Sequence, residues 1–207
     1  MKPIKILLFS DYACPYCYIG KGILYKLQKE YPLEVQWVGY ELRPESPKEG
    51  VSLQSQFPNF DVEKMKKSLN LAGKPYDIVF NRIDRISNTK LALAATEFAR
   101  EEGKLWEFQD LVYQSYFGQG EDIGQIKIIL SCAEKVGLDV PRLEEGLKEE
   151  KYVNILKESR KLGEKYLING IPTFIFENGK VIFGAEPYET FIKVIKEHLD
   201  NEPKDYL

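Results

Sequence analysis

The 207-residue sequence has little of the two residue types that most often hold a structural metal: it contains three cysteines and one histidine. A structural zinc ion takes four ligands, usually cysteine and histidine. Cys14 and Cys17 form a close pair, but the other candidates, Cys132 and His198, are far from it and from each other in the sequence. The shortage of ligands argues against a zinc site, and we expect no metal.

The sequence also lacks a strong excess of one charge and a long apolar segment. Its formal net charge is −3, from 29 Lys and Arg against 32 Asp and Glu, which gives no reason to expect binding to nucleic acid or to an anionic membrane. The apolar run at residues 4–9 is too short for a signal peptide, and no other run approaches a membrane span. We therefore expect a cytoplasmic protein without membrane or nucleic-acid partners.

What the sequence does contain is the motif Cys14-Pro15-Tyr16-Cys17, between a predicted strand at 4–9 and a segment with helical spacing. Unpaired backbone N–H groups and the helix dipole favour an anion at a helix N-terminus, so Cys14 should be held as a thiolate there. Pro15 suits the first turn. Cys17 lies one turn later on the same face and can close a disulfide with Cys14. We predict a redox-active dithiol in which Cys14 is exposed and has a low pKa and Cys17 is shielded. A purely structural disulfide is the weaker alternative, because cytosolic disulfides are usually catalytic or transient.

The rest of the chain predicts an α/β fold. Strand 4–9, a helix ending near Tyr31 and strand 33–38 make a βαβ unit, whose two strands run parallel. Residues 42–50 contain two prolines and a glycine and read as a linker. Near the end, Asn178-Gly179 separates two β-rich runs, 173–176 and 181–183, which is a strong hairpin signal. Helices are expected at 62–71, 88–102, 105–116, 122–136, from 139, at 151–166 and at 186–199.

A second motif, Gly170-Ile171-Pro172-Thr173, directly precedes the hairpin. A strand–helix–strand unit with Cys-x-x-Cys, followed later by Ile-Pro-Thr and a hairpin, resembles the thioredoxin fold. A helical insertion between strand 33–38 and the Pro172 strand is similar to the DsbA-like branch. Within that branch, the segments 9–20, 41–45, 87–89, 170–173 and 184–186 resemble the FrnE-type oxidoreductases.

This resemblance implies a thioredoxin fold with an inserted all-helical domain: residues 1–45 and 150–207 in the thioredoxin-like domain and 46–149 in the insertion. It also implies that Pro172 is cis beside the dithiol and that the Ile171 backbone binds an extended substrate, with Pro15 and Tyr16 as further substrate contacts. Asn88, in Ser87-Asn88-Thr89, is implied to support the site, although a helix N-cap is the plainer role for it.

We therefore predict a cytosolic thiol–disulfide oxidoreductase acting on protein or peptide thiols and disulfides. It would have no tightly bound cofactor beyond its own Cys14–Cys17 disulfide, with glutathione as a candidate co-substrate, and would be a monomer or homodimer. The alternatives are a glutathione-dependent transferase or isomerase of the same architecture, or a non-redox binding module. The related kappa-class glutathione transferases and 2-hydroxychromene-2-carboxylate isomerases carry serine at the position of Cys14, which argues against the first alternative.

Two departures from the family pattern and three further expectations complete the prediction. The fold's usual carboxylate in the first strand is replaced by Leu8, and Asp11 is the nearest substitute unless it only forms a turn. Glu186 stands where glutamine is expected. Cys132 shares a helix face with Ile129 and should be a buried thiol. The remaining expectations are a surface or boundary position for His198 and core positions for the aromatic residues Tyr113, Tyr116 and Phe117.

Overall fold

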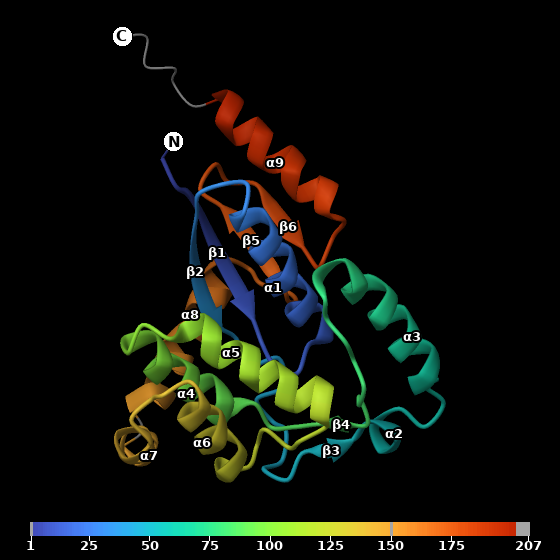
Figure 1. Ribbon diagram of the computed structural model, residues 1–207, viewed down its shortest axis with the longest axis vertical. Coiled ribbons are helices and arrows are strands. Elements are labelled where there is room, and N and C mark those ends of the chain that lie inside the picture. The colour runs from blue at the N-terminus through green and yellow to red at the C-terminus, as the bar shows by residue number, and fades with distance from the viewer. Residues whose placement is uncertain (1, 150, 202–207) are drawn as a thin grey trace.

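A computed structural model describes residues 2–149 and 151–201. Its central element is a four-stranded sheet in the order β2-β1-β5-β6, formed by β1 (Ile4–Ser10), β2 (Leu33–Gly39), β5 (Thr173–Phe176) and β6 (Val181–Phe183). β1 and β2 are parallel, while β5 is antiparallel to both β1 and β6 (Figure 1). The predicted βαβ unit and the predicted hairpin are both present.

Helices cover both faces of this sheet. Leu8 and Phe174 are paired across β1 and β5, so their side chains share a face. α1 (Pro15–Gln28) approaches Phe174 through Gly20, and α9 (Tyr188–Asn201) packs on it through Phe191 at a ring distance of 5.0 Å. The adjacent residue Phe9 points to the opposite face, where its ring contacts Tyr166 just beyond α8 (Lys151–Lys165). The alternation of side chains along β1 thus explains two helical layers.

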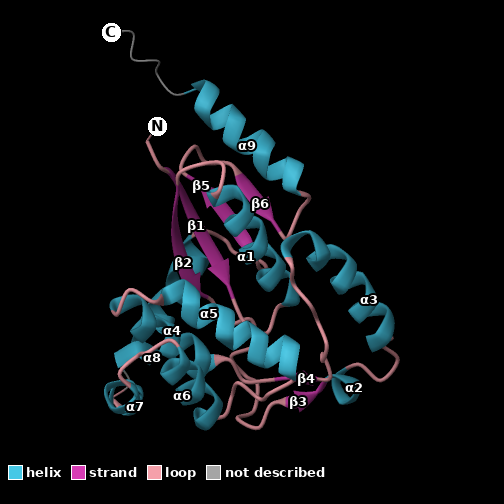
Figure 2. Ribbon diagram, viewed as in Figure 1, coloured by secondary structure: helices cyan, strands magenta, loops and turns pink. Residues whose placement is uncertain are grey.

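The segment between β2 and β5 is mostly helical (Figure 2). α3 lies beside α1, while α4 to α7 form a separate group that packs against α8 and the end of the sheet that carries the dithiol motif (Figure 1). The elements in this segment, besides α8, are β3 (Val51–Ser52), α2 (Leu53–Gln56), α3 (Val62–Gly73), a 3-10 turn η1 (Lys74–Tyr76), β4 (Arg85–Ile86), α4 (Lys90–Glu101), α5 (Leu105–Tyr113), a π-helical segment η2 (Gln114–Gln119), α6 (Ile126–Lys135) and α7 (Val140–Lys148).

The expectation of an all-helical insertion needs one correction. β3 and β4 form a two-stranded antiparallel ladder, with Val51 opposite Ile86 and Ser52 opposite Arg85. Strands of two residues have no alternation for a sequence pattern to detect. The pairing joins the end of the 42–50 linker to the segment that precedes α4. It also places Arg85 and Ile86 in the wall of a groove beside the dithiol motif.

Several helix ends also differ from the prediction. The helix expected at 88–102 begins at Lys90, and the one expected at 122–136 begins at Ile126, because the Asp122 carboxylate accepts from Gly124 N and Ser87 Oγ instead of starting a helix. The helix expected at 105–116 is regular only to Tyr113 and continues as the wider η2, which ends at Gly120 with a positive φ of 71°. Local side-chain hydrogen bonds such as those of Asp122 compete with helix formation.

Buried apolar residues from the sheet, α1 and the insertion form one continuous core. The predicted division at residues 45/46 and 149/150 therefore stays a prediction; residues 1, 150 and 202–207, which it includes, lie outside the described residues. Within 2–149 and 151–201, no helix has both the length and the apolar composition needed to cross a membrane.

Candidate active site

The dithiol motif lies at the junction of β1 and α1. Cys14 is the N-cap of α1, with extended backbone dihedrals, and Pro15 occupies the first helical position. The Cys14 N–H is bonded to Asp11 O at 3.3 Å, and Cys17 N donates to Cys14 O at 3.0 Å, so both ends of the turn are fixed by the backbone. Both cysteines are free thiols. The geometry is the one that stabilises a thiolate at Cys14.

The two thiols differ in environment as the sequence predicts, but neither is exposed. Cys14 is 8% exposed and Cys17 is 1% exposed. The expectation of an exposed Cys14 is therefore wrong, because residues of the insertion cover the N-terminus of α1. Tyr16, between the two cysteines, is 48% exposed and is the part of the motif that faces solvent.

Hydrogen bonding and burial shift the pKa values of the two thiols in opposite directions. The pKa of Cys14 is lowered, chiefly by a hydrogen bond from the Cys17 thiol; burial opposes this, and the backbone N–H groups of Cys17 and Tyr16 contribute to the lowering. The pKa of Cys17 is raised well above its usual value, chiefly by burial and then by that same hydrogen bond to Cys14. Cys14 is therefore the better nucleophile and Cys17 the proton-bearing partner.

The second motif meets the first across 157 residues of sequence. The Cys14 thiol donates to the carbonyl oxygen of Ile171 with a separation of 3.5 Å. The Ile171–Pro172 peptide bond is cis. Pro172 also faces α1, since a Cβ added to Gly20 would lie 3.4 Å from Pro172 Cγ. The main chain that enters β5 thus lies against the Cys14 sulfur.

Asp11 is close to the motif, and its carboxylate is held mainly by backbone N–H groups. Its carboxylate accepts from Ala13 N at 3.3 Å and from Leu42 N at 2.7 Å, and it is 1% exposed. Burial raises its pKa, while these contacts and a hydrogen bond with the Thr89 side chain lower it. Asp11 therefore forms the predicted turn and also fastens the loop after β2 to the site.

Asn88 does not line the space around Cys14. Its side chain accepts from Lys90 N and donates to Ser46 O, and it borders a separate cavity of about 670 Å³ together with Pro44 and Gln125. Asn88 thus does help to start α4, although Thr89 is the N-cap residue. In the Ser87-Asn88-Thr89 motif, Thr89 is the residue connected to the dithiol region, because its side chain hydrogen bonds to the Asp11 carboxylate.

A groove of about 170 Å³ opens beside Cys14, and the insertion supplies most of its walls. Phe57 and Leu42, each 40% exposed, lie along it, and Arg43 lies over the Phe57 ring at 5.7 Å. Arg85, also at the groove, is paired with Asp122 at 3.6 Å. Among the described residues, no acidic side chain forms an ion pair with Arg43. The groove residues are Ala13, Cys14, Pro15, Leu42, Arg43, Leu53, Phe57, Met65, Ile83, Arg85, Ile86, Tyr116 and Phe117.

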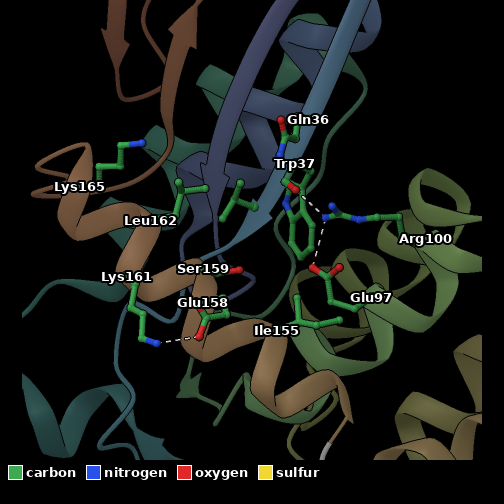
Figure 3. Close-up of a pocket in the computed structure, with 11 residues that line it drawn as sticks. Gln36, Trp37, Glu97, Arg100, Ile155, Glu158, Ser159, Lys161, Leu162 and Lys165 are labelled. Carbon is green, nitrogen blue, oxygen red and sulfur yellow. Dashed lines mark hydrogen bonds and ion pairs between the residues drawn. The ribbon is translucent and has the colours of Figure 1, made fainter.

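A larger cavity, of about 450 Å³, lies elsewhere, between β2, α4 and α8 (Figure 3). Two ion pairs line it: Arg100 bonds to Glu97 and also to the Trp37 carbonyl, and Lys161 bonds to Glu158. No cysteine lines it. This cavity and the one beside Asn88 are both larger than the groove, but of the three only the groove is lined by a cysteine.

The sequence analysis missed two buried hydroxyl groups next to the dithiol. Ser10, at the end of β1, is 3% exposed and is among the groups that oppose the raised pKa of Cys17. Tyr113, at the end of α5 and 2% exposed, has its hydroxyl 3.3 Å from Ser10 Oγ. Tyr113 was expected only in the core, with Tyr116 and Phe117, and that aromatic cluster carries no signal for a contact with residue 10. Among the described residues, no group of three or more His, Cys, Asp or Glu side chains is placed to hold a metal ion.

Comparison with known proteins places these features in context. A family model described as DSBA-like thioredoxin domain matches residues 5–196. The uncharacterized protein YwbO of Bacillus subtilis is 30% identical over 200 residues, which cover 94% of this chain and 96% of YwbO. The ClpXP adapter protein SpxH of Halalkalibacterium halodurans is 24% identical, covering 98% of this chain and 70% of SpxH.

Three solved structures share the fold. A probable DsbA oxidoreductase from Streptomyces coelicolor superposes with a TM-score of 0.87 at 20% identity, covering 99% of this chain and 93% of that one. A 2-hydroxychromene-2-carboxylate isomerase gives a TM-score of 0.77 at 15% identity, covering 94% and 96%. The cytosolic disulfide reductase DsbM from Pseudomonas aeruginosa, determined with GSH, gives 0.68 at 15% identity, covering 93% and 99%. The predicted α/β thioredoxin fold with a helical insertion is confirmed.

Proposed function

The chain belongs to the family of DSBA-like thioredoxin domains, and on that premise we propose that it is a thiol–disulfide oxidoreductase that works through Cys14 and Cys17. The observation that carries the proposal is the position of Cys14: it is the N-cap residue of α1, and its thiol has a lowered pKa and lies 3.5 Å from the Ile171 carbonyl oxygen. Thiol–disulfide exchange with an extended substrate requires a nucleophilic sulfur and a neighbouring main-chain segment with which the substrate can pair.

In the reducing direction, the Cys14 thiolate attacks one sulfur of a substrate disulfide, forming a mixed disulfide and releasing the other substrate sulfur as a thiolate, which takes up a proton. Cys17 then loses its proton and attacks the Cys14 sulfur, which releases the second substrate thiol and leaves a Cys14–Cys17 disulfide. In the oxidising direction the same steps run backwards. The direction depends on the reduction potential of the dithiol relative to its compartment, which we propose is the cytosol.

We further propose that the groove beside Cys14 binds the substrate segment that flanks the reacting sulfur. Its apolar wall, which includes Leu42 and Phe57, suits an aliphatic or aromatic side chain, and Arg43 can pair with a carboxylate that such a segment carries. Protein or peptide thiols fit this description, with Pro15, Tyr16 and Ile171 as contacts nearest the sulfur. Glutathione, which has two carboxylates, is the small-molecule candidate; a structure of DsbM contains it.

A non-redox binding protein is the second candidate function, and one comparison favours it: SpxH, which matches over 98% of this chain, is named as a ClpXP adapter. In such a protein the exposed groove would dock a partner and the dithiol would have no part in it. The isomerase alternative has weaker support, because the match to the isomerase structure is at 15% identity and shows the fold alone.

Insulin-disulfide reduction with dithiothreitol distinguishes these functions. The wild type and the Cys132→Ala control should accelerate the reaction, Cys14→Ser should abolish the acceleration, and Cys17→Ser should accumulate mixed disulfides. If Cys14→Ser is as active as the wild type, or if the wild type gives no acceleration, the oxidoreductase proposal is wrong. Calorimetric titration of Cys17→Ser with glutathione tests the co-substrate separately.

A further inference from the structure

The groove beside Cys14 carries charge of one sign. Of the described residues that line it, none is acidic and two are arginines, Arg43 and Arg85; the others are apolar apart from Cys14 and Tyr116. The side chain of Arg85 is 42% exposed. A cleft lined by charge of one sign attracts ligands of the opposite sign. The groove therefore favours a substrate segment that is negatively charged.

The main chain of Arg85 is fixed at the wall of this groove. Arg85 pairs with Ser52 in the β3–β4 ladder, and the Tyr116 hydroxyl donates to its carbonyl oxygen at 2.8 Å. The same hydroxyl accepts from Ser87 N at 3.1 Å, so it joins the residues on both sides of Ile86. A binding residue whose backbone is already ordered loses less conformational entropy when a ligand arrives.

The guanidinium group of Arg85 keeps most of its hydrogen-bonding capacity. Its Nη1 donates to the Glu49 carbonyl oxygen and lies 3.6 Å from Asp122 Oδ2, which is an ion pair longer than a normal hydrogen bond. Within residues 2–149 and 151–201, no acceptor is bonded to its Nε or Nη2. These two nitrogens can bind a carboxylate in the bidentate geometry for which arginine is suited.

Asp122 does not depend on Arg85 for its own contacts. Its Oδ1 accepts from Ser87 Oγ at 2.7 Å and from Gly124 N at 3.1 Å, and its Oδ2 accepts from Gln125 Nε2 at 3.3 Å. The carboxylate is thus held by its own loop, and its negative charge offsets part of the positive charge that Arg85 presents to the groove. A substrate carboxylate would compete with Asp122 for the same guanidinium group.

We infer that Arg85 determines specificity for substrates with an acidic residue beside the reacting cysteine, and that Asp122 limits this preference. The inference rests on the proposed function and names the substrate class for that site, which is acidic segments of proteins or peptides. Arg85 would contact a substrate carboxylate and not the reacting sulfur. It should therefore act on KM more than on kcat.

The test compares two peptide disulfides that differ only in charge. One peptide has glutamate on both sides of a single cysteine and the other has glutamine, and each is used as its symmetric disulfide. Dithiothreitol regenerates the reduced protein at pH 7, and chromatography follows the released peptide thiol after subtraction of each uncatalysed rate. The measured quantity is the ratio of kcat/KM for the acidic peptide to kcat/KM for the neutral peptide. The wild type should favour the acidic peptide, and added NaCl should reduce this preference because salt screens exposed charges.

Two variants should move this ratio in opposite directions. Arg85→Gln should lower it by about threefold, the size expected for a partly exposed ion pair, through a higher KM for the acidic peptide. Asp122→Asn should raise it. The asparagine keeps Oδ1 as the acceptor for Ser87 and Gly124 but removes the charge that competes for Arg85.

Arg82→Gln and Asp84→Asn are the matched controls. These two residues form an exposed ion pair at 3.1 Å on the same segment, and neither is among the described residues that line the groove. Both variants should keep the wild-type ratio, and urea denaturation shows whether each variant is folded.

The inference is overturned if the wild type reduces both peptides equally well, if folded Arg85→Gln keeps the wild-type ratio, or if Asp122→Asn lowers it. An equal change in the controls would also overturn it. A wild type that reduces neither peptide above the uncatalysed rate would instead refute the oxidoreductase proposal, and the inference would go with it.

Discussion

The Cys14 sulfur lies 3.5 Å from the carbonyl oxygen of Ile171, although 157 positions separate the two residues in the sequence. As a thiol, Cys14 satisfies that carbonyl; as a thiolate it accepts from Cys17 and from the backbone N–H groups of α1 instead. Loss of the Cys14 proton therefore frees the Ile171 carbonyl just as the sulfur becomes reactive. Under the proposed function, a substrate main chain would then bond to this carbonyl.

The first prediction concerns the order in which the thiols react. Cys14 should be alkylated before Cys17 at neutral pH, since its pKa is lowered while burial raises that of Cys17. Because Cys14 is only 8% exposed, a small reagent such as iodoacetamide is needed. Peptide mass spectrometry after timed quenching measures both rates. Faster labelling of Cys17 would contradict the assignment of the nucleophile.

The second prediction tests the buried carboxylate. The negative charge of Asp11 is among the factors that raise the pKa of Cys14, although it is the smallest of the named causes. Asp11→Asn should therefore shift the alkylation profile of Cys14 to lower pH. Glu45→Gln, in the exposed loop after β2, is the matched control and should leave the profile unchanged. A shift to higher pH in Asp11→Asn would mean that the carboxylate assists the thiolate instead of opposing it.

The third prediction concerns the groove. Phe57→Ser should raise the apparent KM for a peptide disulfide with an aromatic residue beside its cysteine by roughly tenfold, or about 1.4 kcal/mol. Arg43→Gln should do so only when the peptide also carries an acidic residue. Val181→Ser, 57% exposed on β6, is the control for loss of an exposed apolar side chain. Equal effects of Arg43→Gln on acidic and neutral peptides would exclude the proposed carboxylate contact.

The fourth prediction is that Cys132 is dispensable for activity. The thiol is 1% exposed on the inner face of α6, next to Ser115. Cys132→Ala should lower the free energy of unfolding by about 1–3 kcal/mol through a small core truncation and leave exchange activity intact. Chemical denaturation and the insulin assay measure the two quantities. A stable but inactive variant would bring Cys132 into the mechanism.

The fifth prediction uses a buried lysine that joins α1 to α5. Lys21 is 2% exposed, forms an ion pair with Asp110 and donates to Tyr25 and to the Trp106 carbonyl. Burial is the main cause that lowers its pKa from 10.5 to about 8. Between these values the unfolded chain binds the proton and the folded chain does not, so this residue makes stability rise with pH, by about 3 kcal/mol at most.

Lys21→Met should remove this contribution, so that the wild type gains stability relative to the variant between pH 8 and 10.5. Urea denaturation at several pH values provides the difference. Lys29→Met, at the exposed C-cap of the same helix, should show no such trend relative to the wild type. A wild type that instead loses stability relative to Lys21→Met across this range would mean that the pKa of Lys21 is raised by Asp110 and not lowered by burial.

The sequence by itself determined the local part of this protein. The Cys14-Pro15-Tyr16-Cys17 motif, the strand before it and the helix after it follow from apolar spacing and from proline in a first helical turn, and the Asn178-Gly179 hairpin follows from turn chemistry. These are properties of neighbouring residues, and the structure reproduces them. The buried position of Cys132 likewise follows from one helix face.

Tertiary structure alone decided what surrounds the sulfur atoms. The burial of Cys14, the groove with Arg43 and Phe57, the β3–β4 ladder and the contact between Ser10 and Tyr113 all depend on how the insertion packs on α1. The aromatic cluster of Tyr113, Tyr116 and Phe117 predicts that Tyr113 lies in a core but does not predict which residue its hydroxyl contacts. The packing of α5 against the end of β1 determines this partner, because a buried hydroxyl group needs a hydrogen-bond partner and tertiary packing decides which residue is close enough.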